Sequence, residues 1–322
     1  MQTRSKTRLS AAKSTPLIPR PLLKPKPKPS LHLNDQITPP KREPSETGLT
    51  PSIASVSLAR NASNQSDNEA SPLKKRKPSP IKPKQGSQRN PPANWEHVYD
   101  EIKLFRQTNP APVDTIGCGI LASPTLPPNI FRFQTFIALL LSSQTKDPIN
   151  AAAIERLITQ LPGGLTPESI LKVDLETLQS ILRGVSFHLR KGVYMKGAAQ
   201  ILVDRFESDL PKQLDEILEL PGIGPKMAHL AMQCCWGVND SGIGVDTHVH
   251  RIANKLGWVH TKKEDPEATR RELEEWLPSK YWAEINPLLV GFGQVHCTAV
   301  RPSCDTCPVS NECPQKDFKK GK

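Results

Sequence analysis

A lysine and an aspartate in the second half of the chain are of the types that could act together on a sugar carbon. Lys226 follows a glycine-containing turn, and Asp246 lies downstream in the run from Val245 to Arg251. A lysine amine is a nucleophile only when it is neutral, and a helix N-terminus disfavours its charged form. A nearby carboxylate could move protons or stabilise a positively charged sugar. The alternative interpretation of Lys226 is a solvated lysine at a helix end.

The elements that would position this pair are two helices joined by a tight turn. Apolar spacing predicts the first helix over residues 213–220. The second is expected to start at Pro225, because proline suits a first helical turn. Between them, Gly222 and Gly224 allow backbone angles that other residues resist. The backbone N–H groups of such a hairpin can meet a phosphate beside the positive end of a helix, so both glycines are candidate phosphate contacts.

Four of the seven cysteines form a cluster near the end of the chain, with a six-two-five spacing. They are Cys297, Cys304, Cys307 and Cys313. An odd cysteine total with four in one cluster argues against a secreted disulfide framework. Four thiolates can hold zinc or an iron–sulfur cluster, and thiolate chemistry alone accepts either. The other three, Cys118, Cys234 and Cys235, are interpreted as ordinary buried thiols.

The charge of the chain is concentrated in its first 93 residues. They hold 18 Lys/Arg and 5 Asp/Glu, a net +13, which leaves −2 for the remainder of a chain of net charge +11. The same segment has 16 of the 33 prolines and no Phe, Trp, Tyr or Cys. Such a composition cannot bury enough apolar surface to offset chain ordering, so a disordered tail is predicted. Any footprint for a polyanion on the folded part must therefore be local.

Two stretches of the tail have the composition of targeting signals. Residues 1–20 carry five basic and no acidic side chains, which is typical of a mitochondrial transit peptide, although a generic basic tail fits equally well. The run from Lys74 to Lys77 fits a nuclear import signal or a solvated charge run. We therefore expect a nuclear and mitochondrial protein. No apolar run reaches about 18 residues, so no membrane span is expected.

Apolar residues at helical spacing predict helices along the rest of the chain, and no stretch alternates as a strand would. The helices are expected over residues 95–105, 132–143, 150–160, 167–171, 175–182, 194–206, 247–256, 270–277 and 282–291. The folded region is therefore predicted to be all-α.

The residues from Leu220 to Lys226, together with those from Val245 to Arg251, resemble the helix-hairpin-helix DNA glycosylases. The lysine is typical of the bifunctional endonuclease III branch, whereas adenine-excising relatives have the aspartate but lack the lysine. The resemblance covers roughly residues 95–314. Pro225 stands where bacterial members carry a basic residue and is frequent in nuclear eukaryotic members. Residues 184–191 resemble the family loop that precedes the next helix and are interpreted as a loop. Ser186 replaces a usual glycine in it, which leaves the shape of this loop open.

The resemblance implies two helical domains with DNA across the cleft between them. A six-helix barrel containing the hairpin would span residues 132–246. An iron–sulfur cluster domain would combine residues 94–131 with 247–322, after a tail over residues 1–93. The six-two-five cysteine spacing is that of the family's [4Fe–4S] loop, so the four clustered cysteines are the implied ligands.

The resemblance also implies an activity, which is base excision repair by an N-glycosylase with associated AP lyase chemistry. Lys226 would attack the sugar C1′ and form a Schiff base with the help of Asp246, and β-elimination would follow. The implied partner is duplex DNA with oxidised pyrimidines or abasic sites, bound by a monomer. A monofunctional glycosylase of the same fold and an inactive DNA-binding or scaffold protein are the alternatives.

Further DNA contacts are expected on the same grounds. Gln144 resembles the family's glutamine that fills the gap left by an extruded base, and a polar helix terminus is its alternative role. Lys191 and His248 are candidate phosphate contacts, with a solvated lysine and a packed histidine as the alternatives. Phe187 or His188 is the candidate for a wedge beside the lesion, and packing is the alternative role for Phe187.

Overall fold

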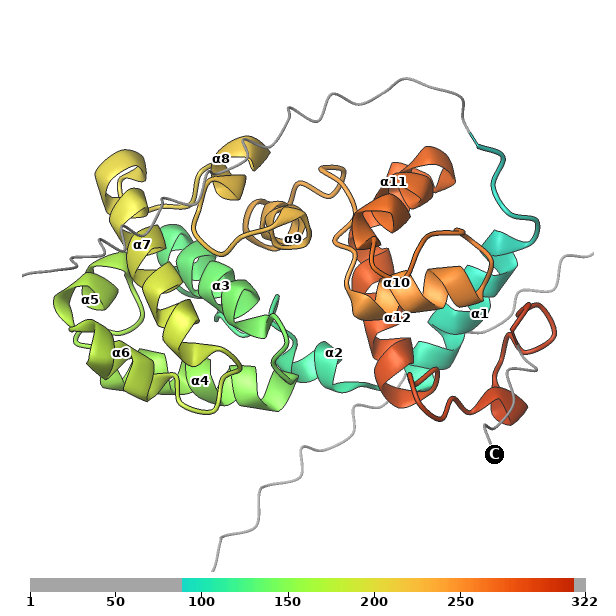
Figure 1. Ribbon diagram of the computed structural model, residues 1–322, viewed down its shortest axis with the longest axis horizontal. Helices are drawn as coiled ribbons and strands as arrows, with labels where there is room; N and C mark the ends of the chain where they lie inside the picture. The colour runs from blue at the N-terminus through green and yellow to red at the C-terminus, as the bar shows by residue number, and fades with distance from the viewer. Residues whose placement is uncertain (1–88, 316–322) are drawn as a thin grey trace, which may run out of the picture. The chain divides into compact units, whose positions relative to one another are not determined.

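The computed structural model of the chain describes residues 89–315, and every regular element within them is helical (Figure 1). Twelve α-helices and two short 3₁₀ helices follow one another, with no strand in this range. The prediction of an all-α fold is therefore confirmed. The predicted targeting signals lie outside the described residues. Within residues 89–315 no helix is both long and apolar enough to cross a bilayer.

Six helices precede the segment that supports the hairpin. They are α1 (Trp95–Thr108), α2 (Pro112–Ile116), α3 (Pro128–Ser142), α4 (Asp147–Gln160), α5 (Pro167–Lys172) and α6 (Leu175–Ile181). Helices α2 to α5 each have a proline in the first turn, where a missing N–H costs nothing. The side chains of Thr166 and Asp174 cap α5 and α6 by accepting backbone N–H groups.

Six helices complete the fold. They are α7 (His188–Phe206), α8 (Leu214–Leu218), α9 (Pro225–Trp236), α10 (Thr247–Lys255), α11 (Pro266–Trp276) and α12 (Trp282–Val295). The 3₁₀ helices are Ser279–Tyr281 and Cys304–Thr306. The hairpin that the glycines predict lies between α8 and α9, as expected.

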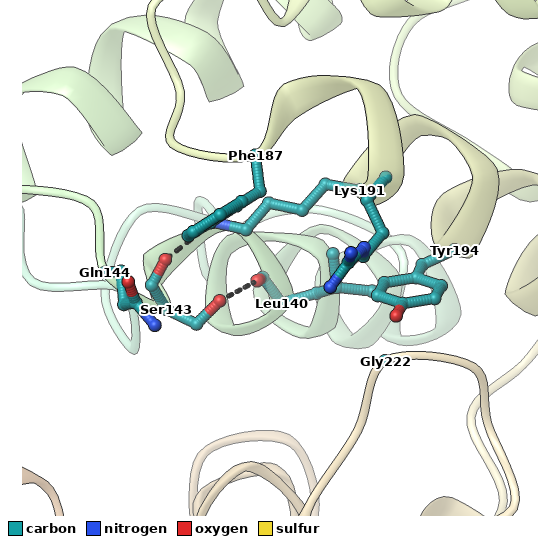
Figure 2. Close-up of a pocket in the computed structure, with 8 residues that line it drawn as sticks. Leu140, Ser143, Gln144, Phe187, Lys191, Tyr194 and Gly222 are labelled. Carbon is teal, nitrogen blue, oxygen red and sulfur yellow. Dashed lines mark hydrogen bonds between the residues drawn. The ribbon is translucent and has the colours of Figure 1, made fainter.

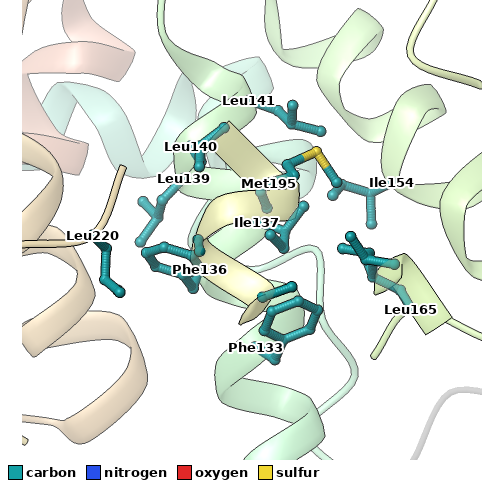
Figure 3. Close-up of a cluster of buried hydrophobic side chains, with 14 of the residues drawn as sticks. Phe133, Phe136, Ile137, Leu139, Leu140, Leu141, Ile154, Leu165, Met195 and Leu220 are labelled. Atoms are coloured by element: carbon teal, nitrogen blue, oxygen red, sulfur yellow. The ribbon is translucent and has the colours of Figure 1, made fainter. Parts of the chain in front are cut away.

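Helix α3 is the centre of the larger hydrophobic core (Figure 3). Its residues from Phe133 to Leu141 are all buried, and α3 packs against α4, α7 and α9. Each fully buried Leu or Phe contributes roughly 1.5–3 kcal/mol relative to an exposed one. This packing fixes the C-terminal end of α3. Ser143 is the C-cap of this helix, and Gln144 is the next residue.

A second hydrophobic core joins α1 to α10, α11 and α12. Its aromatic rings meet edge to face, with centroids 5.3 Å apart for Trp95 and Trp276 and 6.0 Å apart for Trp258 and Trp276. This core holds α10, whose first residue follows Asp246. The domain boundaries that the resemblance implies stay a prediction.

Helix α7 begins at His188, six residues before the predicted start at 194. The interpretation of residues 184–191 as a loop was therefore wrong for its last four residues. Phe187 precedes the helix in the left-handed region, with φ of 55°, and sets the direction of the first turn. As a result, Arg190 and Lys191 belong to a helix rather than a loop.

The chain is already attached to the fold at Arg89, inside the segment predicted as a tail. Its Nη1 lies 2.7 Å from Glu272 Oε2 on α11, and its Nη2 lies 3.3 Å from His260 Nδ1. This ion pair is solvent-exposed, so it contributes at most about 1 kcal/mol.

Candidate functional site

The hairpin between α8 and α9 requires glycine at position 222 for two reasons. Gly222 has φ of 82°, and a Cβ added there would lie 2.5 Å from a ring carbon of Tyr194. Gly224 differs, because it has φ of −117° and an added Cβ would meet no atom within 4 Å. The space beside Gly224 is therefore open, at the point where the backbone N–H groups of α9 begin.

Lys226 lies in the first turn of α9, half-buried, immediately after Pro225. Its positive charge is close enough to lower the pKa of two neighbours, Asp246 and Cys118. Burial dominates at Cys118, so the pKa of that thiol is still raised. The ammonium of Lys226 therefore lies within electrostatic reach of both the N-terminus of α10 and the loop between α2 and α3.

Asp246 is the N-cap of α10, and its carboxylate is almost fully engaged. Its Oδ1 accepts the backbone N–H groups of His248 and Val249, at 2.9 and 2.8 Å. Its Oδ2 lies 2.9 Å from His248 Nδ1, and the side chain is 12% exposed. Burial alone would raise the pKa of Asp246, but the hydrogen bond from His248 and the charge of Lys226 outweigh it and lower the pKa. Asp246 is therefore a carboxylate at neutral pH.

The two histidines of α10, His248 and His250, have different surroundings. His248 is partly exposed and is bound to Asp246, so its free Nε2 side faces away from that contact. His250 is buried, with Nδ1 2.7 Å from Thr269 Oγ1 and Nε2 3.1 Å from the Lys263 carbonyl. His250 therefore has a packing role, and the phosphate contact of His248 stays a prediction.

A pocket of about 200 Å³ lies where the end of α3, the start of α7 and the hairpin meet (Figure 2). Its lining residues are Leu140, Ser143, Gln144, Phe187, Arg190, Lys191, Tyr194 and Gly222. Neither Lys226 nor Asp246 lines it, so this pocket is separate from the lysine–aspartate pair. Gln144 and Phe187 are both exposed and both left-handed, with φ of 53° and 55°.

Lys191 is buried, whereas the sequence predicts either a phosphate contact or a solvated side chain at this position. It is 3% exposed. Its ammonium donates to the carbonyl oxygens of Leu141 and Ser143, both at 2.7 Å, and to Thr145 Oγ1 at 3.1 Å. Burial lowers the pKa of Lys191 to about 8. All three donors are occupied by the protein itself, which disfavours a phosphate contact in this conformation.

The four clustered cysteines lie on the loop after α12 and are all free thiols. Within residues 89–315, no three His, Cys, Asp or Glu side chains are close enough to hold a metal ion. The thiols are nonetheless near one another, because Cys297, Cys304 and Cys313 each act on the pKa of Cys307. Burial raises that pKa to about 11. The donor set is that of a tetrathiolate site.

Helix α10 connects the cysteine loop to Asp246. Arg251 Nη1 donates to the carbonyl oxygen of Cys297 at 2.7 Å, and Cys313 Sγ lies 3.7 Å from the carbonyl oxygen of Lys255. Gly293 of α12 makes room for this helix, because an added Cβ would lie 2.6 Å from the His248 ring. The loop and the predicted catalytic aspartate are therefore held by one helix.

Comparison with known proteins places this arrangement in a family. Residues 137–279 match the HhH-GPD superfamily base excision DNA repair protein family. Endonuclease III-like protein 1 of Bos taurus is 47% identical over 223 residues, which are 69% of this chain and 72% of that protein. The chain belongs to the endonuclease III homologues. Endonuclease III homolog 1, chloroplastic, of Arabidopsis thaliana is 50% identical over 230 residues, which are 70% of this chain but only 59% of that protein.

Solved structures agree on the fold of this endonuclease III homologue. An endonuclease III in a non-covalent complex with DNA superposes with a TM-score of 0.58 at 24% identity, over 69% of this chain and 95% of that one. A trapped covalent endonuclease III–DNA intermediate gives a TM-score of 0.57 at 24% identity, over 69% and 97%. At 24% identity, this structural similarity establishes a shared fold.

Two residues around the site were missed from the sequence. Tyr194 packs against Gly222, and Arg251 contacts Cys297. Tyr194 follows Lys191 by one helical turn, but that spacing is informative only once α7 is known to begin at His188. Arg251 lay within the motif that carries the resemblance, yet no spacing rule connects it to a cysteine 46 residues away.

Proposed function

We propose that this protein is a base excision repair DNA N-glycosylase with associated AP lyase activity, which removes oxidised pyrimidines from duplex DNA. Membership of the endonuclease III homologues supports the glycosylase. The positions of Lys226 in the first turn of α9 and of Asp246 at the N-cap of α10 support the lyase assignment, because a Schiff-base route requires an amine nucleophile and a carboxylate to assist it.

Lys226 is the proposed nucleophile. Its neutral amine adds to the sugar C1′ while the C1′–N bond breaks and the base leaves with the bonding electrons, to be protonated as it departs. Loss of an amine proton and opening of the sugar ring then give a Schiff base. Removal of a C2′ proton breaks the C3′–O bond and cuts the strand. Lys226, in the first turn of α9, would make the attack on C1′ at the hairpin, and the proton from C2′ would pass to a base or to water.

Asp246 is the proposed electrostatic partner. Its lowered pKa keeps it ionised at neutral pH, so it suits a positively charged sugar better than it suits the donation of a proton. Its engagement as the cap of α10 leaves little freedom to move. We therefore assign it stabilisation of the sugar cation and acceptance of a proton.

The proposed DNA contacts surround this pair. Gly222 and Gly224 are proposed to present backbone N–H groups to a phosphate, and the space beside Gly224 is open to receive it. Gln144 enters the base stack, which offsets part of the cost of extruding the damaged base. His248 contacts a phosphate with the ring edge that Asp246 leaves free.

A [4Fe–4S] cluster is the proposed cofactor, held by Cys297, Cys304, Cys307 and Cys313. Four free thiols on one loop support this donor set. When bound, the cluster would cross-link a loop that has little helix of its own. Through Arg251 and the carbonyl of Lys255, that loop packs on α10, which suggests a structural role in supporting Asp246. A nuclear and mitochondrial location is proposed from the tail composition alone.

A nicking assay on a duplex containing thymine glycol tests the activity. The expected result is strand cleavage 3′ to the lesion without added AP endonuclease. Release of the base with an intact strand would instead support a monofunctional glycosylase. Binding with no release would support the inactive DNA-binding alternative. The presence of both Lys226 and Asp246 favours the bifunctional enzyme over both the monofunctional glycosylase and the inactive DNA-binding protein.

A further inference from the structure

The end of α3 is closed by a buried ammonium from another helix. A helix leaves its last carbonyl groups without intrahelical partners, and they require donors when buried. Here Lys191 of α7 supplies these donors. Its Nζ lies 2.7 Å from the Leu141 carbonyl oxygen and 2.7 Å from that of Ser143. Figure 2 shows the Lys191 side chain reaching Ser143. A cation at a helix C-terminus is also favoured by the helix dipole. These contacts explain why a lysine is tolerated at 3% exposure.

Gln144 is the residue whose conformation this arrangement determines. It lies between two of the groups that Lys191 binds, the Ser143 carbonyl and Thr145 Oγ1. Its φ of 53° is left-handed, which a residue with a Cβ adopts only when its surroundings require it. Gln144 itself is exposed. Its backbone is therefore held from both sides while its side chain remains free.

The same helix also seats the hairpin. One turn beyond Lys191, the ring of Tyr194 packs so closely on Gly222 that a Cβ there would lie 2.5 Å from it. Gly197, about two turns after Lys191, faces Pro221. A Cβ added at Gly197 would lie 3.2 Å from a ring carbon of Pro221. Helix α7 therefore fixes the distance between the hairpin and the turn formed by residues 143–145, which we call the Gln144 turn. Lys191 is the residue that attaches α7 to the Gln144 turn.

We infer that Lys191 is a positioning residue that holds the Gln144 turn in its left-handed form, at a set spacing from the hairpin, so that the glutamine can enter the duplex. This inference rests on the proposed function for the role of Gln144 in DNA. Lys191 does not touch DNA in this assignment. Its loss should therefore weaken engagement of the duplex while the chemistry at Lys226 continues once DNA is bound.

The chain offers a matched control on the same helix. Lys196 also donates its ammonium to carbonyl groups at the end of a helix, that of Leu171 in the last turn of α5 and that of Val173 just after it. Lys196 is not among the residues that line the pocket beside Gln144. Lys191→Met and Lys196→Met each remove one helix-capping ammonium, and only the first should affect the Gln144 turn. Thr145→Val is a milder variant. It removes one acceptor of Lys191 and the hydroxyl's own hydrogen bond to the Ser143 carbonyl at 3.2 Å, while Lys191 still donates to that carbonyl.

The first measurement is hydrogen exchange of the Thr145 amide, which donates to the Ser142 carbonyl at 3.1 Å. It is made without DNA, so it does not depend on the proposed function. Lys191→Met and Thr145→Val should each lower protection of this amide by about tenfold, with Lys196→Met unchanged. Unchanged protection in both Lys191→Met and Thr145→Val, in proteins that remain folded by circular dichroism, would overturn the inference.

The second measurement is binding and single-turnover cleavage with a duplex that contains one abasic site. Lys191→Met should weaken binding by about tenfold, with a cleavage rate at saturation close to that of the unmodified protein. A double-mutant cycle with Gln144→Ala should be strongly non-additive, because both changes remove the same insertion. Additive effects, or equal losses in Lys191→Met and Lys196→Met, would also overturn it. An unmodified protein that neither excises nor cleaves would instead refute the proposed function, and the exchange result would still decide the role of Lys191.

Discussion

Asp246 and His248 are bound to one another twice, through main chain and side chain. Asp246 Oδ1 accepts the His248 backbone N–H at 2.9 Å, and Asp246 Oδ2 lies 2.9 Å from His248 Nδ1. One carboxylate therefore caps α10 and orients an imidazole while Lys226 acts on its pKa. Structural and chemical roles coincide at this residue, and variants must be chosen to separate them.

Asp246→Asn should separate the two roles. Asparagine is as good an N-cap as aspartate, so the free energy of unfolding should change by less than about 1 kcal/mol. The negative charge beside Lys226 is lost, so base excision should fall by at least about a hundredfold, as when one stabilising group is removed from an active site. Chemical denaturation and single-turnover excision measure the two quantities. Excision at the normal rate in Asp246→Asn would refute the assigned role.

The two hairpin glycines should respond differently to alanine. Gly222→Ala forces a Cβ into Tyr194 at φ of 82°, and it should destabilise the protein by about 1–3 kcal/mol. Gly224→Ala places its Cβ in open space, so the expected loss of stability is only that of alanine at the N-cap of α9, about 1 kcal/mol or less. Gly224→Ala should still weaken DNA binding, because the methyl group occupies the space proposed for a phosphate. Thermal unfolding and fluorescence anisotropy distinguish the two effects, and a Gly224→Ala protein with unaltered DNA affinity would remove Gly224 from the proposed interface.

A buried histidine one turn after Lys226 should make stability depend on pH. His229 is 3% exposed, and its pKa is lowered to about 4, first by burial and then by the charge of Arg270. The unfolded chain, with a histidine pKa near 6.5, therefore binds more protons than the folded one between pH 4 and 6.5. The stability associated with neutral His229 is present above pH 6.5 and is lost as pH falls toward 4, by about 3 kcal/mol.

His229→Gln tests this pH dependence, since glutamine does not titrate. The difference in unfolding free energy between the unmodified protein and the variant, measured by urea titration, should shrink or reverse as pH falls from 6.5 to 4. A difference that is constant across this range would show that His229 is not the group responsible.

The cysteine loop should bind iron. Protein purified without oxygen should contain iron and sulfide and absorb in the visible range, and Cys307→Ser should lose most of both. Cys235→Ser is the matched control, because Cys235 is a buried thiol outside the loop. Elemental analysis that finds zinc and no iron would replace the proposed cluster with a zinc site.

The sequence predicted the helices and the hairpin better than it predicted where side chains go. Strong apolar periodicity, as in residues 133–141, identified α3 because burial of that whole face determines the element. The start of α7 was missed because it depends on Phe187 in a left-handed conformation, which local propensity does not favour. The burial of Lys191 was missed because its partners, Leu141 and Ser143, are nearly fifty residues away. The candidate site was found through motif residues, whereas its supporting contacts are tertiary.

Reduction with borohydride in the presence of an abasic duplex tests the central claim most directly. A Schiff base between Lys226 and the sugar C1′ would be fixed as a stable amine that links protein to DNA. We predict a covalent adduct with the unmodified protein and none with Lys226→Gln, although that variant should still bind the duplex. Failure of the unmodified protein to form the adduct, or an undiminished adduct in Lys226→Gln, would contradict the account.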